Sequence, residues 1–311
     1  MLPARFRNLG LFVLVSVLFG SVFVGIKAGQ TALPPVFFGA LRFDIAAPLL
    51  LGYAAWRSRT WLPRTRADFA SVAVSAVTII AANNALLFVG QQTTTPAVAA
   101  VMYGLNPILA PVFAFLLLGE RLDVRGAVGI LLGLVGVVII VQPSPATFTS
   151  GSTIGELMVL GAAAAFALGS VSIERFDADM ESIPLTAWAM VGGAALLHLL
   201  SVGLGESLAG TVLTPTVIAA VLVVGLASTA VAYPAYFALI PRIGPVRTNL
   251  VAYVAPVVAA ITGWVLLDEP VTLATVAGFF VIVAGVALLE RRVLVAEYER
   301  FARRRAGAES E

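Results

Sequence analysis

Long runs of apolar residues, separated by short polar links, make up almost the entire chain. Many of these runs approach the ~20 residues that an α-helix needs to cross a bilayer. The pattern predicts ten transmembrane helices, over residues 9–28, 35–56, 69–90, 96–118, 125–141, 154–173, 183–204, 214–239, 246–267 and 272–290. The links leave no room for a soluble domain, so we expect an all-α polytopic membrane protein.

Composition agrees with this class and excludes several kinds of chemistry. Of the 311 residues, 60% are hydrophobic and 12% are charged, and the mean hydropathy is +1.00, whereas a soluble domain has roughly 25% charged residues. The sequence has no cysteine and a single histidine, His198, which excludes disulfides, thiolate metal sites and cysteine nucleophiles. We expect no metal, no cofactor, no nucleic-acid partner and no enzymatic activity, because an intramembrane enzyme needs a nucleophile–base pair or a metal cluster.

Arginines predict the orientation of the chain. If the N-terminus lies in the cytoplasm, the links assigned to the outside contain no arginine or lysine, as the positive-inside rule requires. The inside segments then hold Arg5, Arg7, Arg57, Arg59, Arg64, Arg66, Arg121, Arg125, Arg175, Arg242, Arg247 and the six arginines after Glu290. Both termini are therefore expected in the cytoplasm.

An internal repeat divides the chain. The segment NPILAPVFAFLLLGERL (106–122) resembles APVVAAITGWVLLDEPV (255–271), at an offset of 149 residues. The repeat predicts two five-helix units, residues 1–146 and 147–292, followed by a cytoplasmic tail, 293–311. Because five is odd, the second unit enters the membrane from the opposite side, and inverted repeats of this kind are a recurring architecture of alternating-access transporters.

The same segments resemble a known family. LFGSVFVGIK (18–27), ALRF (40–43) and the stretch from TPAVAAV to GVVIIV (95–141) are similar to the EamA-type half of the drug/metabolite transporter superfamily, and 256–290 carries a weaker copy. The resemblance implies ten helices and transport of a small metabolite, often export, but no particular substrate. The chain departs from the family at Phe19, where tryptophan is frequent, and at Asp44, where an apolar residue is usual.

Three charges within or at the end of the predicted spans are candidates for function, namely Lys27, Arg42 and Asp44. Arg42 and Asp44 point about 200° apart on a helix, so they do not pair with each other. Arg42 either snorkels, holds an anionic group or pins neighbouring helices, and we favour pinning. Asp44 is too short to snorkel and is either a hydrogen-bonded carboxyl or a proton-coupling site. Lys27 either forms the mouth of a pathway or anchors the first helix at the interface, which we favour.

Polar and aromatic side chains deep in the spans are candidates for a solute cavity between the halves, because lipid offers them no partners. Interhelical hydrogen bonding or ordinary packing is the alternative for each. The predicted lining residues are Asn83, Asn84, Tyr103, Asn106, Trp188, Tyr233, Tyr236 and Tyr253, and Thr229 shares a helix face with two of these tyrosines. Prolines predict bends in the same helices, namely Pro107, Pro111, Pro234 and Pro256.

Together these features predict a multi-pass secondary transporter of the cytoplasmic (inner) membrane that moves a small metabolite by alternating access. Export of amino acids or related compounds is the first hypothesis. The alternatives are an importer, or a carrier of sugars, nucleobases or nucleotide-linked sugars, although a phosphate-bearing solute would need more cations than Lys27 and Arg42 provide. Proton coupling is left open, as is assembly as a monomer or a homodimer.

Overall fold

The computed structural model describes residues 4–58, 60–119, 124–142, 151–176, 178–244, 248 and 250–289. All regular secondary structure in these ranges is helical. The elements are α1 (Ala4–Gly29), α2 (Pro35–Arg57), α3 (Arg66–Ser75), η1 (Ala76–Ala82), α4 (Asn83–Gly90), α5 (Pro96–Tyr103), α6 (Asn106–Leu118), α7 (Val124–Val141), α9 (Ser152–Ile173), α10 (Ser182–Gly203), α11 (Pro215–Val221), η2 (Leu222–Val231), α12 (Ala232–Ile243), α14 (Val251–Leu267) and α15 (Leu273–Leu289). The predicted tail, 293–311, lies outside the described residues.

The helices have the length and composition of membrane spans. Among the described residues, seven helical segments are long and apolar enough to cross a bilayer, and three shorter apolar helices accompany them: Gly126–Val141, Val251–Leu267 and Leu273–Leu288. Every predicted apolar run overlaps one of these segments. The chain is therefore an all-helical, multi-pass membrane protein, while the number of ten crossings and their orientation stay predictions.

Local capping signals determine where several spans begin. Thr95 and Thr214 precede the first prolines of α5 and α11, and each hydroxyl accepts a hydrogen bond from the backbone N–H three residues further on. Thr65 and Asp68 form a reciprocal capping box at the start of α3. These side chains satisfy N–H groups that a helix leaves unpaired in its first turn, and proline fits there because it has no N–H to satisfy.

The two halves of the chain interlock. α1 packs mainly on α11, η2, α12 and α14, whereas α9 packs on η1, α4, α5 and α6. α2 runs along α10 and also contacts η2. The first helix of each half therefore packs chiefly on helices of the other half, so residues far apart in the sequence meet inside the bundle.

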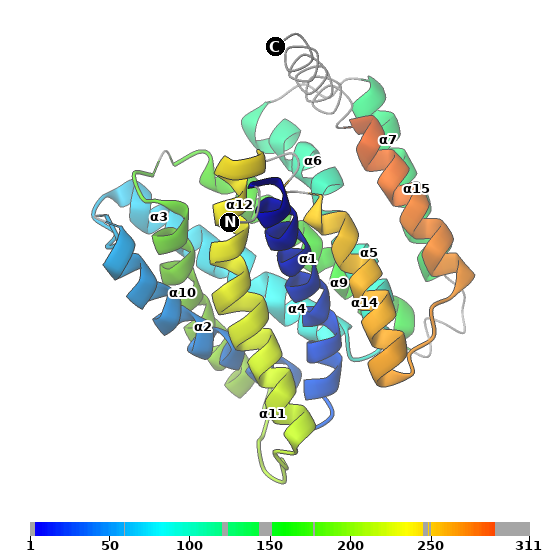
Figure 1. Ribbon diagram of the computed structural model, residues 1–311, viewed down its shortest axis with the longest axis horizontal. Helices are drawn as coiled ribbons and strands as arrows, with labels where there is room; N and C mark the ends of the chain where they lie inside the picture. The colour runs from blue at the N-terminus through cyan, green and yellow to red at the C-terminus, as the bar shows by residue number, and fades with distance from the viewer. Residues whose placement is uncertain are drawn as a thin grey trace.

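The α7–α15 pair lies to one side of the bundle, at the right in Figure 1. Glycines let the two backbones touch: a Cβ added at Gly136 would lie 3.0 Å from the Gly278 carbonyl oxygen, and one at Gly285 would lie 2.7 Å from the Gly129 carbonyl oxygen. Small residues commonly permit such close packing between membrane helices. A structural role for the pair agrees with this geometry.

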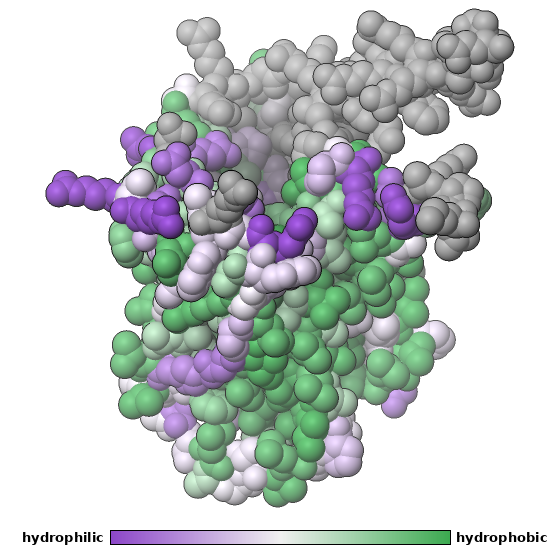
Figure 2. Space-filling view, turned by 60° about the vertical axis from the view of Figure 1, so that its left-hand side comes forward, coloured by the Kyte–Doolittle hydropathy of each residue, from purple (hydrophilic) through white to green (hydrophobic). Residues whose placement is uncertain are grey.

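The outer surface of the bundle is largely apolar. Figure 2 shows a broad hydrophobic band, with hydrophilic residues gathered mainly toward one end. Large apolar side chains such as Leu131, Val202 and Trp264 are more than half exposed, which suits contact with lipid and not with water. We call the end where α1 stops and α2 starts the Lys27 end, and the end where α2 stops and α3 starts the Trp61 end.

Candidate functional site: a buried arginine between the two halves

Arg42 occupies the interior of the bundle, seven residues into α2, and only 6% of its surface is exposed. Its Nε and Nη2 groups donate to Thr229 Oγ1 at 3.2 and 2.9 Å, and Nη1 donates to Asn84 Oδ1 at 3.0 Å. Thr229 belongs to η2 and Asn84 to α4. The guanidinium therefore joins helices from both halves of the chain.

Close approach of the backbones makes the contact with Thr229 possible. A Cβ added at Gly225 of η2 would lie 3.3 Å from the Arg42 carbonyl oxygen, so this glycine lets α2 and η2 pack tightly. The Thr229 hydroxyl donates its own hydrogen to the Val224 carbonyl, five residues earlier, at 2.6 Å. Because the hydroxyl hydrogen is used in this bond, the lone pairs of Oγ1 can accept hydrogen bonds from Arg42. π-helical turns such as this one often occur at functional sites.

A chain of amides continues from Arg42 to Tyr103. Asn84 Nδ2 donates to the Ile80 carbonyl at 2.8 Å and to Asn83 Oδ1 at 3.2 Å. Asn83 Nδ2 donates to the Tyr103 hydroxyl at 3.0 Å and to the Ala162 carbonyl of α9 at 2.7 Å. Both asparagines are buried. We define the Arg42 network as Arg42, Thr229, Asn84, Asn83 and Tyr103.

Aromatic rings surround the network. The Arg42 guanidinium carbon lies 4.9 Å from the centre of the Phe43 ring and 5.9 Å from that of Phe88. Tyr103 and Tyr233 are close enough to Arg42 to interact electrostatically with it, and both remain partly exposed although they lie well inside their spans. Deep side chains that keep accessible surface are the kind that can contact a solute.

A second group of rings joins α1 to α12. Phe19 lies with its ring centre 5.7 Å from those of both Tyr233 and Tyr236. Pro234 lies between these tyrosines near the start of α12. Tyr253 of α14 packs against the large apolar cluster that contains Phe23 and Phe88. The predicted aromatic residues of α12 and α14 thus line the interface of α1 with the second half of the chain.

The helix over 96–118 is interrupted beside Tyr103. α5 ends at Tyr103 and α6 begins at Asn106, with Pro107 in its first turn and Pro111 further inside. The buried Oδ1 atom of Asn106 has no hydrogen-bond partner among the described residues. By contrast, Pro256 lies inside α14, which continues past it.

Asp44 lies on a different surface of α2 from Arg42. Asp44 Oδ2 is 2.8 Å from His198 Nε2 of α10, and their side chains are 42% and 38% exposed. The His198 ring also meets Phe37 edge to face, with ring centres 5.7 Å apart. This pair bridges α2 and α10 on the outside of the bundle.

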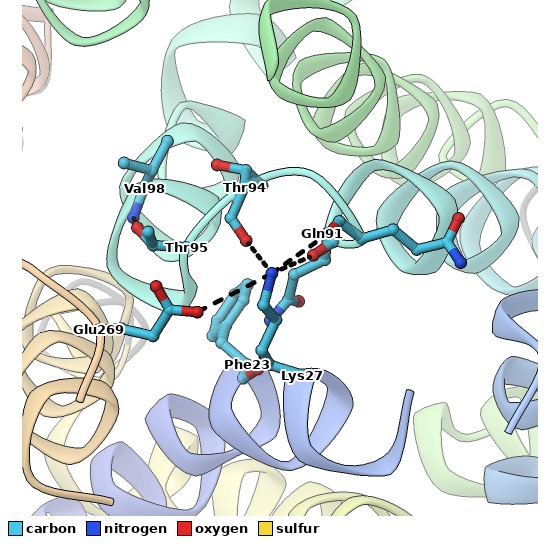
Figure 3. Close-up of polar contacts among 8 residues, drawn as sticks. Phe23, Lys27, Gln91, Thr94, Thr95, Val98 and Glu269 are labelled. Atoms are coloured by element: carbon cyan, nitrogen blue, oxygen red, sulfur yellow. Dashed lines mark hydrogen bonds and ion pairs between the residues drawn. The ribbon is translucent and has the colours of Figure 1, made fainter. Parts of the chain in front are cut away.

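Lys27 closes the end of the bundle that we name after it. Its Nζ donates to the backbone carbonyls of Gln91, Gln92 and Thr94 at 3.4, 3.2 and 3.1 Å. These carbonyls lie in the link after α4, close to the helix C-terminus, which carries partial negative charge. Figure 3 shows the ammonium group pointing into this set of oxygens, so Lys27 binds the α4–α5 link.

Lys27 also reaches the other half of the chain. Its Nζ lies 3.9 Å from Oε1 of Glu269, in the link between α14 and α15 (Figure 3). Both side chains are about a quarter exposed, at 25% and 23%. Nearby, Gln30 Nε2 donates to the Phe88 carbonyl at 2.6 Å, and Gln91 Nε2 donates to the Phe23 carbonyl. These contacts hold α1 to α4 and to the α14–α15 link.

Trp188 lies toward the Trp61 end, in the first third of α10. Its ring stacks on Trp61 with centres 6.4 Å apart, and its Nε1 donates to the Trp61 carbonyl at 2.9 Å. The structure thus gives Trp188 a partner in the α2–α3 link, whereas Tyr103 and Tyr233 lie beside Arg42.

Two glutamates that the sequence analysis did not single out have distinct positions. Glu206 accepts hydrogen bonds from the backbone N–H groups of Val36 and Phe37 at 2.9 and 2.8 Å and from Ser201 Oγ at 2.7 Å, so it caps α2. Glu156 of α9 is 9% exposed, and its Oε2 has no partner among the described residues. An acidic residue inside an apolar run indicates a functional site. The sequence alone could therefore have identified Glu156 as a candidate.

The residues described by the structure contain no group of three or more His, Asp and Glu side chains placed to hold a metal ion. The Arg42 network combines hydrogen bonds with one buried cation. This arrangement suits recognition of a solute.

Comparison with known proteins gives a consistent result. The EamA-like transporter family matches the chain twice, over residues 8–142 and 153–291. The uncharacterized transporter YoaV of Bacillus subtilis (strain 168) is 25% identical over 273 residues, which cover 88% of this chain and 92% of YoaV. The uncharacterized inner membrane transporter YedA of Escherichia coli (strain K12) is 28% identical over 267 residues, which cover 83% of this chain and 84% of YedA. A solved crystal structure with 21% identity has a TM-score of 0.63 and covers 91% of this chain and 97% of that chain, which shows a shared fold.

Proposed function

The chain belongs to the EamA-like transporter family, and from this premise we propose that it exports amino acids or related compounds across the cytoplasmic membrane by alternating access. The observation that carries the proposal is the Arg42 network. Its members come from α2, α4, α5 and η2 and from both family repeats. A protein that only supported other chains would need no polar network of this kind inside its spans.

Alternating access is supported by the relation between the halves. The π-helical residues 76–82 and 225–231 are separated by the same offset of 149 as the sequence repeat. The first helix of each half packs chiefly on the other half. A solute held between two such units becomes accessible from either side when the units rock against each other.

The proposed orientation is supported by the basic residues. Described arginines near the Trp61 end or elsewhere on the same predicted side include Arg7, Arg57, Arg64, Arg66, Arg175 and Arg242. The positive-inside rule then places the Trp61 end in the cytoplasm and the Lys27 end outside. In this orientation the contacts of Lys27 close the outer end of the bundle.

Amino acids fit the network better than phosphate-bearing solutes do. The Arg42 network contains a single cation, and Lys27 already binds three carbonyls at the end of the bundle. A nucleotide-linked sugar carries at least two negative charges and would call for a second cation near Arg42. Tyr103 and Tyr233 offer both ring surface and hydroxyls to a solute that is partly apolar.

Transport by the purified protein tests the proposal. Liposomes containing the full chain would be loaded with one labelled amino acid at a time, and efflux would be measured with and without a pH gradient. We expect saturable efflux of at least one amino acid above that of protein-free liposomes. A panel in which no amino acid leaves faster than from protein-free liposomes would contradict amino-acid export and favour the sugar or nucleobase alternatives.

A further inference from the structure

The charge of Arg42 has no counter-charge in the part of the chain that the structure describes. No carboxylate there lies within 4.0 Å of its guanidinium, and both of its hydrogen-bond acceptors are neutral. Only 6% of the residue is exposed. A buried cation is normally paired with an anion, because neutral acceptors replace only part of the lost hydration.

The hydrogen-bonding capacity of Arg42 is also incompletely used. A guanidinium has five N–H hydrogens. The Nε–H and one hydrogen each on Nη1 and Nη2 are directed to Thr229 and Asn84. One hydrogen on each terminal nitrogen therefore remains for a further acceptor.

The chemistry of this acceptor can be narrowed to a carboxylate. The planar guanidinium matches the two oxygens of a carboxylate, and the pair forms short, charge-assisted hydrogen bonds. One carboxylate neutralises the single charge of Arg42, whereas a phosphate group would leave negative charge unbalanced. Described acids in the helices lie elsewhere. Asp44 pairs with His198 on the outer surface, Asp68 caps the start of α3, and Glu156 is not in contact with Arg42.

The residues around Arg42 suit the rest of such a solute. Phe88 lies against the guanidinium, and Tyr103 and Tyr233 are its neighbouring tyrosines. Apolar and aromatic groups of a solute gain from contact with these rings. We propose that Arg42 binds the carboxylate of the transported solute, which makes the substrate class small monocarboxylates with an apolar or aromatic body, amino acids included. This inference rests on the proposed transport function.

The test compares each acid with its amide. Purified protein in detergent would be titrated with L-phenylalanine, L-leucine and 3-phenylpropionate, and with the corresponding amides, while its thermal unfolding is followed. We expect at least one acid to raise Tm and its amide to act about 10- to 100-fold more weakly, as expected for loss of a charge-assisted contact. If no acid stabilises the protein more than its amide does, the inference is overturned.

Variants separate recognition from a purely structural role. In Arg42→Gln we expect the preference for acid over amide to disappear, and in Arg42→Lys we expect it to shrink, because lysine keeps the charge but not the planar fork. Arg57→Gln, at an exposed arginine on the same helix, should keep the wild-type preference. If Arg42 has only a structural role, both Arg42 variants should have a lower Tm without ligand but the same preference for acid over amide. That result would also overturn the inference.

Transport of the same pairs in liposomes distinguishes this inference from the proposed function. Equal efflux of an acid and its amide would contradict carboxylate recognition and leave the transport function standing. Stabilisation by the acids in detergent, without efflux of any compound from liposomes, would contradict the proposed export. It would leave recognition of the carboxylate by Arg42 standing.

Discussion

Arg42 and Thr229 are 187 positions apart in the sequence, yet two nitrogens of the arginine share the threonine hydroxyl at 3.2 and 2.9 Å. The contact links α2 of the first family repeat to η2 of the second. Thr229 can accept both hydrogen bonds because its own proton is directed to the Val224 carbonyl. A single neutral oxygen thus orients the one buried cation of the network.

Removal of this hydroxyl should destabilise the protein. In Thr229→Val, the Nε–H and one Nη2–H of Arg42 lose their acceptor while still buried, at a cost of about 1–3 kcal/mol. Thr229→Ser keeps the oxygen and should cost less. Chemical unfolding of the purified variants in detergent measures both values, and a loss in Thr229→Val no larger than that in Thr229→Ser would contradict the role given to the hydrogen bonds.

Lys27 and Glu269 should contribute unequally to stability, although they form an ion pair. Lys27→Met leaves the three carbonyls after α4 without their donor, and hydrogen bonds to a charged group contribute about 1.5–3 kcal/mol. Glu269→Gln removes a 3.9 Å contact between partly exposed groups, which contributes about 0–1 kcal/mol. Lys27→Arg is the matched control. A larger loss for Glu269→Gln than for Lys27→Met would contradict the role given to the contacts of Lys27 with the α4–α5 link.

Glu206 should stabilise the start of α2. In Glu206→Ala, the N–H groups of Val36 and Phe37 lose their acceptors, and loss of a helix cap costs about 0.5–2 kcal/mol. Glu206→Gln keeps one oxygen and should fall between alanine and the native residue. Leu208→Ala, at an exposed position in the same link, is the control. The apparent Tm of the four proteins in detergent provides the comparison, and an unchanged Tm in Glu206→Ala would rule out the cap.

Much of the fold and part of the candidate site could be predicted from the sequence, for a physical reason. Apolar runs of span length have few options in a membrane, so each predicted run overlaps a helix. Deep polar groups need partners in a bilayer, and the structure brings Arg42, Asn83, Asn84 and Tyr103 into one network.

The remaining features depend on which helices pack against each other. The pattern of apolar and polar residues does not specify these neighbours. The pairing of Asp44 with His198 requires α2 and α10 to lie side by side. The capping of α2 by Glu206 requires the α10–α11 link to fold over Pro35. Pro107 and Pro256 correspond in the repeat, yet the helix is interrupted just before Asn106 and Pro107 and continues through Pro256.

A disulfide between the halves should stop transport. A Cβ added at Gly263 of α14 would lie 3.5 Å from Cβ of Pro96 in α5, which is within the usual disulfide range of about 3.5–4.5 Å. The chain has no cysteine of its own, so Pro96→Cys with Gly263→Cys introduces one defined pair. We expect oxidation to block efflux and reduction to restore it, because the link fixes the Lys27 end closed.

Single-cysteine variants keep this test specific. Pro96→Cys and Gly263→Cys each carry one thiol in a chain that has no other cysteine, so neither can form the link. Oxidation should therefore leave the efflux of both single variants unchanged. Undiminished efflux after complete formation of the Pro96–Gly263 cross-link would mean that α5 and α14 do not separate during the cycle.

If efflux responds to a pH gradient, Glu156 should matter for that response more than Asp44 does. Asp44 is 42% exposed and already pairs with His198 on the outside of the bundle, whereas Glu156 is buried and its Oε2 has no partner among the described residues. A carboxyl that couples protons to a conformational cycle must gain and lose its proton inside the protein. We expect Glu156→Gln to abolish the response to the gradient while exchange of labelled for unlabelled solute continues, and Asp44→Asn to keep it. Loss of the response in Asp44→Asn, with Glu156→Gln unaffected, would place coupling on the α2–α10 surface instead.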